Sequence, residues 1–273
     1  MQRAMRLSFI KMHGLGNDFV ILDGRESDLP RLSQAQVRAL ADRHRGVGFD
    51  QMIVLAPSDE ADFAMRIYNA DGGEVEACGN ASRAVAVLHG RPATIATAGG
   101  TIAVRPGDAQ AEVAMGRARF EWQDIPLAYA MDTREMPVGW EMLERPGAAN
   151  VGNPHVVFFV EDIDAVPLDR LGPEIEHDAM FPERINVNVA QVVSRHAIRL
   201  RVWERGAGLT LACGTGACAT AAVAHRRGLV DRQVEVTLPA GTLTIRHDED
   251  GGIHMSGPAQ ESYRGSFELD DFC

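Results

Sequence analysis

The stretch YNADGGEVEACG, residues 68–79, aligns without gaps on WERGAGLTLACG, residues 203–214, and this internal repeat decides the fold. The offset that separates Cys78 from Cys213 also separates Gln51 from Asn186, so each cysteine has an amide side chain at the same distance upstream. A helix-like sequence follows each Cys-Gly pair. Because these features recur in the same order, the sequence predicts a duplicated domain.

The repeat weakens away from the cysteines. Gly16-Asn17 matches Gly152-Asn153 at a slightly larger offset, and Gly100-Thr101-Ile102 resembles Gly241-Thr242-Leu243 at a larger offset still. The two halves therefore differ by small insertions, and the region around each cysteine is the core of the match.

Apolar alternation and helix-terminating residues predict strands and helices in both halves. Ser33 and Gln36 form a capping-box pattern, and Gly46 is a suitable helix end. The expected helices are Ser33–Arg45, Asn80–His89, Asp164–Leu171 and Gly216–Arg227. The expected strands are Leu7–Met12, Asp18–Asp23, Gln51–Ala56, Asp62–Asn69, Thr94–Thr97, Thr101–Arg105, Ala111–Met115, Val156–Val160, Val187–Val193, Ile198–Trp203, Gln233–Leu238, Thr242–Arg246 and Ile253–Ser256.

The composition is typical of a globular protein and disfavours partners such as nucleic acid and membranes. The chain has 273 residues, of which 45% are hydrophobic and 24% charged, as in globular proteins of about two domains. A net charge of -11 disfavours nucleic acid as a partner. No apolar run is long enough to span a bilayer, and the N-terminal residues do not resemble a signal peptide, so a cytoplasmic protein without a membrane partner is expected.

Cysteine spacing argues against a metal site. The four cysteines, at positions 78, 213, 218 and 273, form no Cys-x-x-Cys motif, and reduced thiols are expected. We expect Cys218 to pack within a helix and Cys273 to be a tail residue. Lys11 is the only lysine, so a pyridoxal cofactor has no evident anchor, and no cofactor is expected.

Cys78 and Cys213 each precede the first turn of an Ala-rich helix. The positive end of the helix dipole should lower a thiol pKa from about 8.5 towards neutrality. If the halves are related by two-fold symmetry, the two sulfur atoms can face each other. Inversion of a carbon stereocentre needs a base on one side and an acid on the other, which a thiolate and a thiol supply.

Seven motifs resemble, in order, those of the diaminopimelate epimerase family. Members of this family are cofactor-independent enzymes of lysine and peptidoglycan precursor synthesis. They are KMHGLGNDF (11–19), GVGFDQ (46–51), ACGN (77–80), GNPH (152–155), ERIN (183–186), ERGAG (204–208) and ACGTG (212–216). The resemblance covers nearly the whole chain.

The resemblance implies an α+β (mixed α/β) fold of two pseudo-symmetric domains, each a β-sheet wrapped around a central helix. Residues 116–150 contain three prolines and little periodicity, so the crossover between the halves is expected near their start, with one half at residues 1–117 and the other at 118–259. The resemblance implies that the chain end, residues 260–273, returns to complete the first half. It implies conversion of LL- to meso-diaminopimelate, and a homodimer with a contact at Tyr263.

The resemblance also implies a set of site residues. The catalytic residues would be Cys78, Cys213, His155 and Glu204. Donors to the reacting carboxylate would be Gly79, Asn80, Gly214 and Thr215. The rest of the substrate site would be formed by Asn17, Gln51, Asn69, Asn153, Asn186, Glu204 and Arg205.

Two alternatives remain. A proline or hydroxyproline racemase would use the same two-cysteine chemistry, but Arg205 with Asn153 and Asn186 favours a substrate with a second charged end. A thiol redox protein would join Cys78 to Cys213 in a disulfide. That function would leave the repeated amides without a role.

Overall fold

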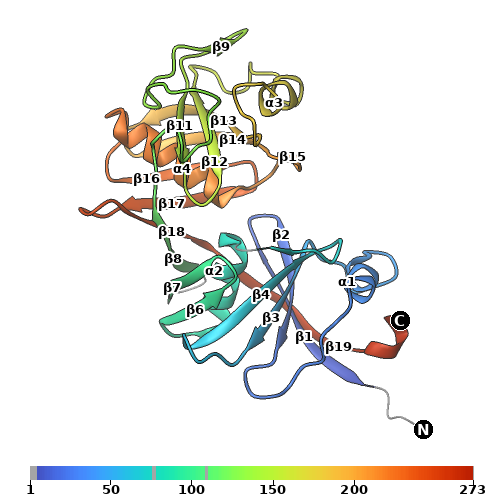
Figure 1. Cartoon of the computed structure of the whole chain (residues 1–273). Coiled ribbons are helices and arrows are strands. Elements are labelled where there is room, and N and C mark those ends of the chain that lie inside the picture. Colours follow the sequence, from blue (N-terminus) through green and yellow to red (C-terminus); the bar gives the residue numbers. More distant parts are fainter. Residues whose placement is uncertain (1–4, 76–77, 108–109, 273) are drawn as a thin grey trace. The chain divides into compact units, whose positions relative to one another are not determined.

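The computed structural model describes residues 5–75, 78–107 and 110–272 (Figure 1). It divides into two compact units, one formed by residues 1–113 and 257–273 and the other by residues 114–256. Both units consist mainly of strands with few helices, which confirms the predicted α+β class. Among the described residues, no helix is both long and apolar enough to cross a membrane.

The first unit is a sheet that surrounds one buried helix. Its strands are β1 (Arg6–Gly14), β2 (Asn17–Asp23), β3 (Gln51–Ala56), β4 (Phe63–Asn69), β5 (Glu74–Val75), β6 (Ala93–Thr97), β7 (Gly100–Gly107), β8 (Gln110–Arg117) and β19 (Gln260–Glu268), followed by the 3-10 helix η1 (Leu269–Phe272). Helix α2 (Gly79–His89) lies against β1, β7 and β19, and its residues from Asn80 to Ala86 are all buried. Helix α1 (Gln34–Ala41) packs through Val37 and Leu40 onto a separate apolar cluster.

The second unit repeats this plan. Its strands are β9 (Gly139–Trp140), β10 (Leu143–Glu144), β11 (Gly147–Asn150), β12 (Pro154–Phe159), β13 (Asn186–Ser194), β14 (Ala197–Glu204), β15 (Gly208–Thr210), β16 (Gln233–Leu238), β17 (Gly241–His247) and β18 (Gly252–Pro258). Helix α4 (Gly214–Arg226) lies against β11, β12, β13, β16 and β17, and is buried from Gly216 to Ala224. Helix α3 (Leu168–Glu176) packs beside β13, β14 and β15.

Strand register confirms the predicted duplication. In the antiparallel pairs β3–β4 and β13–β14, Met52 lies opposite Tyr68 and Val187 opposite Trp203, with both residues shifted by the offset that separates the two cysteines. In the parallel pairs β4–β6 and β14–β16, Phe63 pairs with Ile95 and Ile198 with Val236. Ile95 and Val236 are separated by the larger offset that the Gly-Thr motifs show in the sequence. The second unit therefore has its extra residues between β14 and β16, in the stretch that corresponds to the one between β4 and β6.

Helix α1 is shorter than predicted. It begins after Ser33, whose capping box with Gln36 is present, but it ends at Ala41 instead of Arg45. Oδ1 of Asp42 accepts hydrogen bonds from the backbone N–H groups of His44 and Arg45. These local bonds form a turn that competes with the helix, so the chain leaves the helix early.

Helix α3 differs most from its prediction, because it lies at Leu168–Glu176 instead of Asp164–Leu171. Gly172 and Pro173, which follow the last residue of the predicted helix, fall inside the observed one. A Cβ atom on Gly172 would come within 2.5 Å of the Trp203 ring, so the glycine permits close packing. Burial of Leu168 and Ile175 therefore outweighs the local cost of the Gly-Pro pair.

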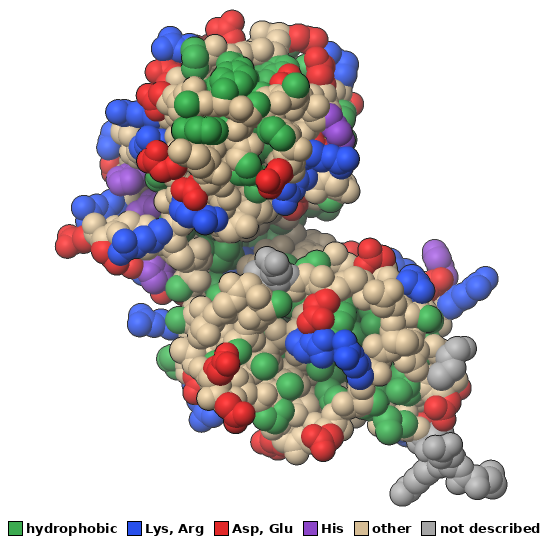
Figure 2. All heavy atoms as spheres, viewed as in Figure 1, with side chains coloured by type: hydrophobic (Ala, Val, Ile, Leu, Met, Phe, Trp, Pro, Cys, Tyr) green, Lys and Arg blue, Asp and Glu red, His purple; other side chains and the backbone are tan. Residues whose placement is uncertain are grey.

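Charged side chains are interspersed over the surface. Figure 2 shows acidic and basic groups mixed on the visible face of each unit, and the net charge of -11 is not gathered into one patch there. Cys273, expected to be a tail residue, lies outside the described residues, as do residues 1–4 of the predicted first domain.

Candidate functional site

Cys78 is the residue that precedes helix α2, and its backbone is extended. Its sulfur lies 4.0 Å from Oδ1 of Asn17, at the start of β2. The same oxygen accepts a hydrogen bond of 3.3 Å from Nδ2 of Asn80, and the amino group of Asn17 donates to Asp50 at 2.9 Å. Three residues of the predicted site, Cys78, Asn17 and Asn80, are thus brought together within this unit.

A fully buried arginine orients Asn80. Arg83 is 0% exposed and donates from Nη2 to Oδ1 of Asn80 at 2.9 Å. Because the carbonyl of Asn80 is occupied, its amino group faces Asn17. Arg83 was not among the predicted site residues, since one arginine in an Ala-rich helix gives no sign of such burial.

Gln51 and Asn69 lie opposite each other on β3 and β4. Nε2 of Gln51 donates to Oδ1 of Asn69 at 3.1 Å. Oε1 of Gln51 is buried and has no hydrogen-bond partner among the described residues. A buried unsatisfied acceptor is costly, so this oxygen is suited to receive a donor from a ligand.

An ion network holds the loop beside Asn17. Lys11 donates to Asp18 at 2.5 Å and to the carbonyl oxygen of Gly48, and Arg43 binds both Asp18 and Asp50. Burial opposes ionisation of Asp18, but the hydrogen bonds from Arg43 and Lys11 prevail and hold its pKa well below the usual range. The network keeps the Asp50 carboxylate next to Asn17.

Cys213 precedes helix α4 in the second unit. Its sulfur accepts a hydrogen bond of 3.3 Å from the backbone N–H of Gly216 and lies 3.5 Å from the Thr215 hydroxyl. Nδ2 of Asn153 donates to that hydroxyl oxygen at 3.4 Å. A Cβ atom on Gly216 would come within 3.2 Å of the sulfur and 2.7 Å of Oδ1 of Asn188, so only glycine fits easily here.

The expected lowering of the thiol pKa is wrong for Cys213. Burial raises the pKa of this thiol well above its usual value, and the negative charge of Glu204 raises it further. The hydrogen bonds from Thr215 and Gly216 act in the opposite direction and are outweighed. A helix terminus therefore lowers a thiol pKa only where burial and nearby carboxylates do not dominate.

His155 is fully buried on β12. Its Nε2 lies 2.9 Å from Oδ1 of Asn153, and its Nδ1 lies 3.1 Å from Nδ2 of Asn188. Burial lowers the pKa of His155 to about 3, and the positive charge of Arg205 contributes, so the imidazole is neutral at pH 7. Its role as a catalytic residue stays a prediction. Its contacts suit a group that orients Asn153.

Three further predicted residues lie at the ends of two strands. Asn186 begins β13, Glu204 ends β14, and Arg205 follows it. Oδ1 of Asn186 accepts from the backbone N–H of Arg205 at 2.9 Å. The Arg205 guanidinium is exposed and donates to the carbonyl oxygen of Glu183 at 3.0 Å. Glu204 accepts a hydrogen bond from Thr210. Asp50 and Asn188 belong to the surroundings of the two cysteines, although they were not among the predicted site residues.

Tyr263 lies on β19, where it is 49% exposed and packs edge-on against Phe9. Its place in a dimer contact stays a prediction.

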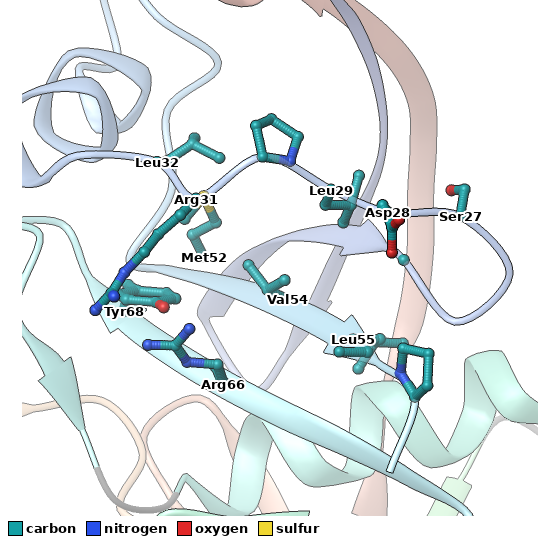
Figure 3. A pocket seen from close by; sticks show the side chains of 14 residues that line it. Ser27, Asp28, Leu29, Arg31, Leu32, Met52, Val54, Leu55, Arg66 and Tyr68 are labelled. Carbon is teal, nitrogen blue, oxygen red and sulfur yellow. The ribbon is translucent and has the colours of Figure 1, made fainter.

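A cavity of about 200 Å³ lies elsewhere in the first unit, between the loop of residues 27–32 and strands β3 and β4 (Figure 3). Met52 and Val54 line it from the face of β3 opposite to Gln51, and Leu55 and Ala56 line it where the strand ends. Arg66, at its edge, already pairs with Glu74. None of the predicted site residues lines this cavity.

The family model and the relatives of similar sequence agree on one family. A family model described as diaminopimelate epimerase matches residues 9–121 and 147–261. A diaminopimelate epimerase of Erythrobacter litoralis is 64% identical over 98% of this chain and 100% of its own length, and one of Rhizorhabdus wittichii is 60% identical over 98% of both. A crystal structure of a hydroxyproline epimerase from Agrobacterium vitis has a TM-score of 0.66 at 16% identity, covering 99% of this chain and 94% of its own, and shares the fold. The chain therefore belongs to the diaminopimelate epimerase family.

Proposed function

We propose that the chain converts LL-2,6-diaminopimelate to meso-diaminopimelate without a cofactor, with Cys78 and Cys213 as its two bases. One observation carries the assignment of the bases. Each cysteine is the N-cap residue of a buried helix, and equivalent strand pairs precede it in the two units. Membership of the family gives the substrate.

The reaction moves one proton at each face of the α-carbon. A thiolate takes the α-proton, which breaks the C–H bond, forms an S–H bond and leaves negative charge shared with the adjacent carboxylate. The thiol of the other cysteine then donates its proton to the opposite face, which forms the inverted C–H bond and leaves a thiolate. No electrons are gained or lost, and the two cysteines exchange protonation states.

Helix N-termini supply the donors for the reacting carboxylate. The backbone N–H groups at Gly79, Asn80, Gly214 and Thr215 lie in the first turns of α2 and α4 and face no earlier carbonyl in the helix. Such donors stabilise the charge that develops when the α-proton leaves.

The remaining predicted residues are suited to the distal end of the substrate. The exposed Arg205 guanidinium can bind the second carboxylate with two parallel hydrogen bonds. Asn186 fixes the backbone that carries it. The unsatisfied Oε1 of Gln51 is an acceptor for an ammonium group.

The finer biological setting is also part of this proposal. The product would enter lysine and peptidoglycan precursor synthesis in the cytoplasm. A homodimer with Tyr263 in the contact would be the working form, which the exposure of that ring on β19 supports.

The two alternatives are less favoured. The hydroxyproline epimerase likeness, at 16% identity, extends to the fold alone. A disulfide-forming redox protein would need the cysteines but would give no role to Asn17, Asn153 or Arg205.

The test is proton exchange in deuterium oxide. Reduced protein incubated with LL-diaminopimelate should incorporate deuterium at the α-position and form the meso isomer, as followed by NMR. Cys78→Ala and Cys213→Ala should each abolish epimerisation, whereas Cys218→Ala, which removes a buried thiol in the interior of α4, should retain it within a few fold. No exchange by folded wild-type protein that binds the ligand would overturn the proposal.

A further inference from the structure

Asn17 and Asn153 occupy equivalent places in the two units. Each lies shortly before the residue that begins a parallel pair, Phe19 with Gln51 in one unit and His155 with Asn186 in the other. Each contacts the second residue of the helix that follows a cysteine, which is Asn80 or Thr215. The direction of the hydrogen bond between these partners nevertheless differs.

In the first unit, the carbonyl oxygen of Asn17 faces the cysteine. Asp50 accepts from Nδ2 of Asn17 at 2.9 Å and from Arg43 at 2.8 Å. A carboxylate can only accept, so Asn17 must turn its amino group to Asp50. Its Oδ1 then accepts from Asn80 and lies 4.0 Å from the sulfur of Cys78.

In the second unit, the amino group of the equivalent asparagine faces the cysteine side. Nδ2 of Asn188 lies 2.9 Å from a backbone carbonyl oxygen, so it is the amino group that faces Nδ1 of His155. The buried, neutral imidazole therefore carries its proton on Nε2 and donates to Oδ1 of Asn153. Asn153 then donates to Thr215, whose hydroxyl proton is left for the sulfur of Cys213 at 3.5 Å.

The sequence encodes this difference at three positions. Each group that sets an orientation has an apolar residue at the equivalent position of the other unit: Asp50 corresponds to Ile185, Asn188 to Ile53, and His155 to Phe19. Neither unit can therefore form the hydrogen-bond chain of the other.

We propose that Asp50 and Asn188 are positioning residues that give the two half-sites hydrogen-bond chains of opposite direction, so that the chain ends in an acceptor at Cys78 and in a donor at Cys213. The Glu204 carboxylate also lies beside the sulfur of Cys213, but it belongs to neither chain. The two cysteines are then chemically unequal before substrate binds. The consequence for catalysis rests on the proposed function, but the hydrogen-bond directions do not, and they can be measured without substrate.

The first test is alkylation of Cys78 in Asp50→Ile/Asn80→Thr, which gives the first unit the residue types that the second unit has at Ile185 and Thr215. Only the thiolate reacts with iodoacetamide, and an acceptor next to the sulfur favours the thiol. Asp50→Ile removes the acceptor of Nδ2 of Asn17, and Asn80→Thr removes the amino group that faces its Oδ1. Asn17 is then free to turn its amino group towards the sulfur, so the alkylation rate of Cys78 at pH 7, followed by peptide mass spectrometry, should rise at least about threefold. An unchanged rate would contradict the proposal.

Removal of the Asp50 charge could raise the same rate directly, and Asn17→Ala separates the two causes. In that background, the substitutions at Asp50 and Asn80 should have little further effect on Cys78. An effect as large as in the wild type would show that the charge of Asp50 acts by itself, and the positioning role would be wrong.

The second test uses the unmodified protein. Long-range ¹H–¹⁵N NMR should show the Nε2–H tautomer of His155 at pH 7. An Nδ1–H tautomer would reverse the direction of the chain in the second unit and overturn that half of the proposal. Failure of epimerase activity would leave both readouts unaffected, so the two proposals fail independently.

Discussion

The hydroxyl of Thr210 donates a hydrogen bond of 2.5 Å to Oε1 of Glu204. The carboxylate that is held in this way raises the pKa of the Cys213 thiol. Burial is the first cause of the raised pKa of Cys213, and the charge of Glu204 is the second. These two causes outweigh the donors at Thr215 and Gly216, so Cys213 holds its proton more tightly than an exposed thiol does.

Glu204→Gln should lower the pKa of Cys213, because the second cause of its rise is removed while burial remains. The measurement is the pH dependence of Cys213 alkylation, with a midpoint expected at lower pH than in the wild type. Thr210→Val is the matched control, since it removes the hydrogen bond but leaves the charge. If Thr210→Val shifts the midpoint as far as Glu204→Gln does, the charge is not the cause.

His247 should make the free energy of unfolding depend on pH. Burial, with a contribution from the stacked ring of His225, lowers the pKa of His247 from 6.5 to about 4. Between these values the unfolded chain binds a proton that the folded chain does not. The stabilisation is thus complete above pH 6.5 and decreases as the pH falls towards 4, by up to about 1.4 kcal/mol per pH unit.

The check is urea denaturation of wild type and His247→Gln at pH 7.5, 6.0 and 5.0. The variant should lose less stability than the wild type between pH 7.5 and 5.0, because it lacks one of the protons taken up on unfolding. His155, with a pKa of about 3, should still contribute in both proteins. Parallel losses would exclude His247 as a source of the dependence.

Gly172→Ala should destabilise the second unit although alanine is the better helix former. A Cβ atom would lie 2.5 Å from the Trp203 ring, and overpacking of this kind costs roughly 1–3 kcal/mol, more than the gain in helix propensity of about 1 kcal/mol. The exposed Glu174→Ala in the same helix should be nearly neutral. A rise in the melting temperature of Gly172→Ala would mean that the ring moves away at little cost.

Lys11→Met should destabilise the first unit by about 2 kcal/mol, because it leaves Asp18 partly buried with only Arg43 as a cation. Lys11→Arg keeps the charge and should recover part of the loss. Urea denaturation at pH 7 measures both. Equal stability of Lys11→Met and wild type would show that Arg43 compensates fully.

The fold could be predicted where the hydrophobic pattern of a segment agrees with the internal repeat. The constant offset around the two cysteines predicts matched strands and two central helices, and register confirms it at Met52–Tyr68 and Val187–Trp203. The helix across Gly172-Pro173 could not be foreseen, because its cause is a tryptophan on another element, β14. Strand β11 was missed since its Gly-Ala-Ala-Asn sequence has no alternation, and its small residues are needed against α4, where Gly147 lies close to Val223.

The residues of the candidate site were also predicted only in part. Motifs selected residues at the ends of strands and helices, such as Asn17 at the start of β2 and the N-cap residues Cys78 and Cys213. They did not select Arg83 or Asn188, whose role depends on burial and on which atom of a neighbour they face. The raised pKa of Cys213 was also missed, since a helix terminus is visible in sequence and the burial that overrides it is not.

The only lysine of the chain, Lys11, is buried and ion-paired, so the exposed positive charge of the described surface belongs to arginine. Acetyl transfer and other lysine acylations, which alter many metabolic enzymes, have no accessible lysine side chain here. Cross-linking with amine-reactive reagents will likewise give no lysine–lysine distances between the two units. Carboxyl- or arginine-directed reagents are the ones that can measure distances between the two units.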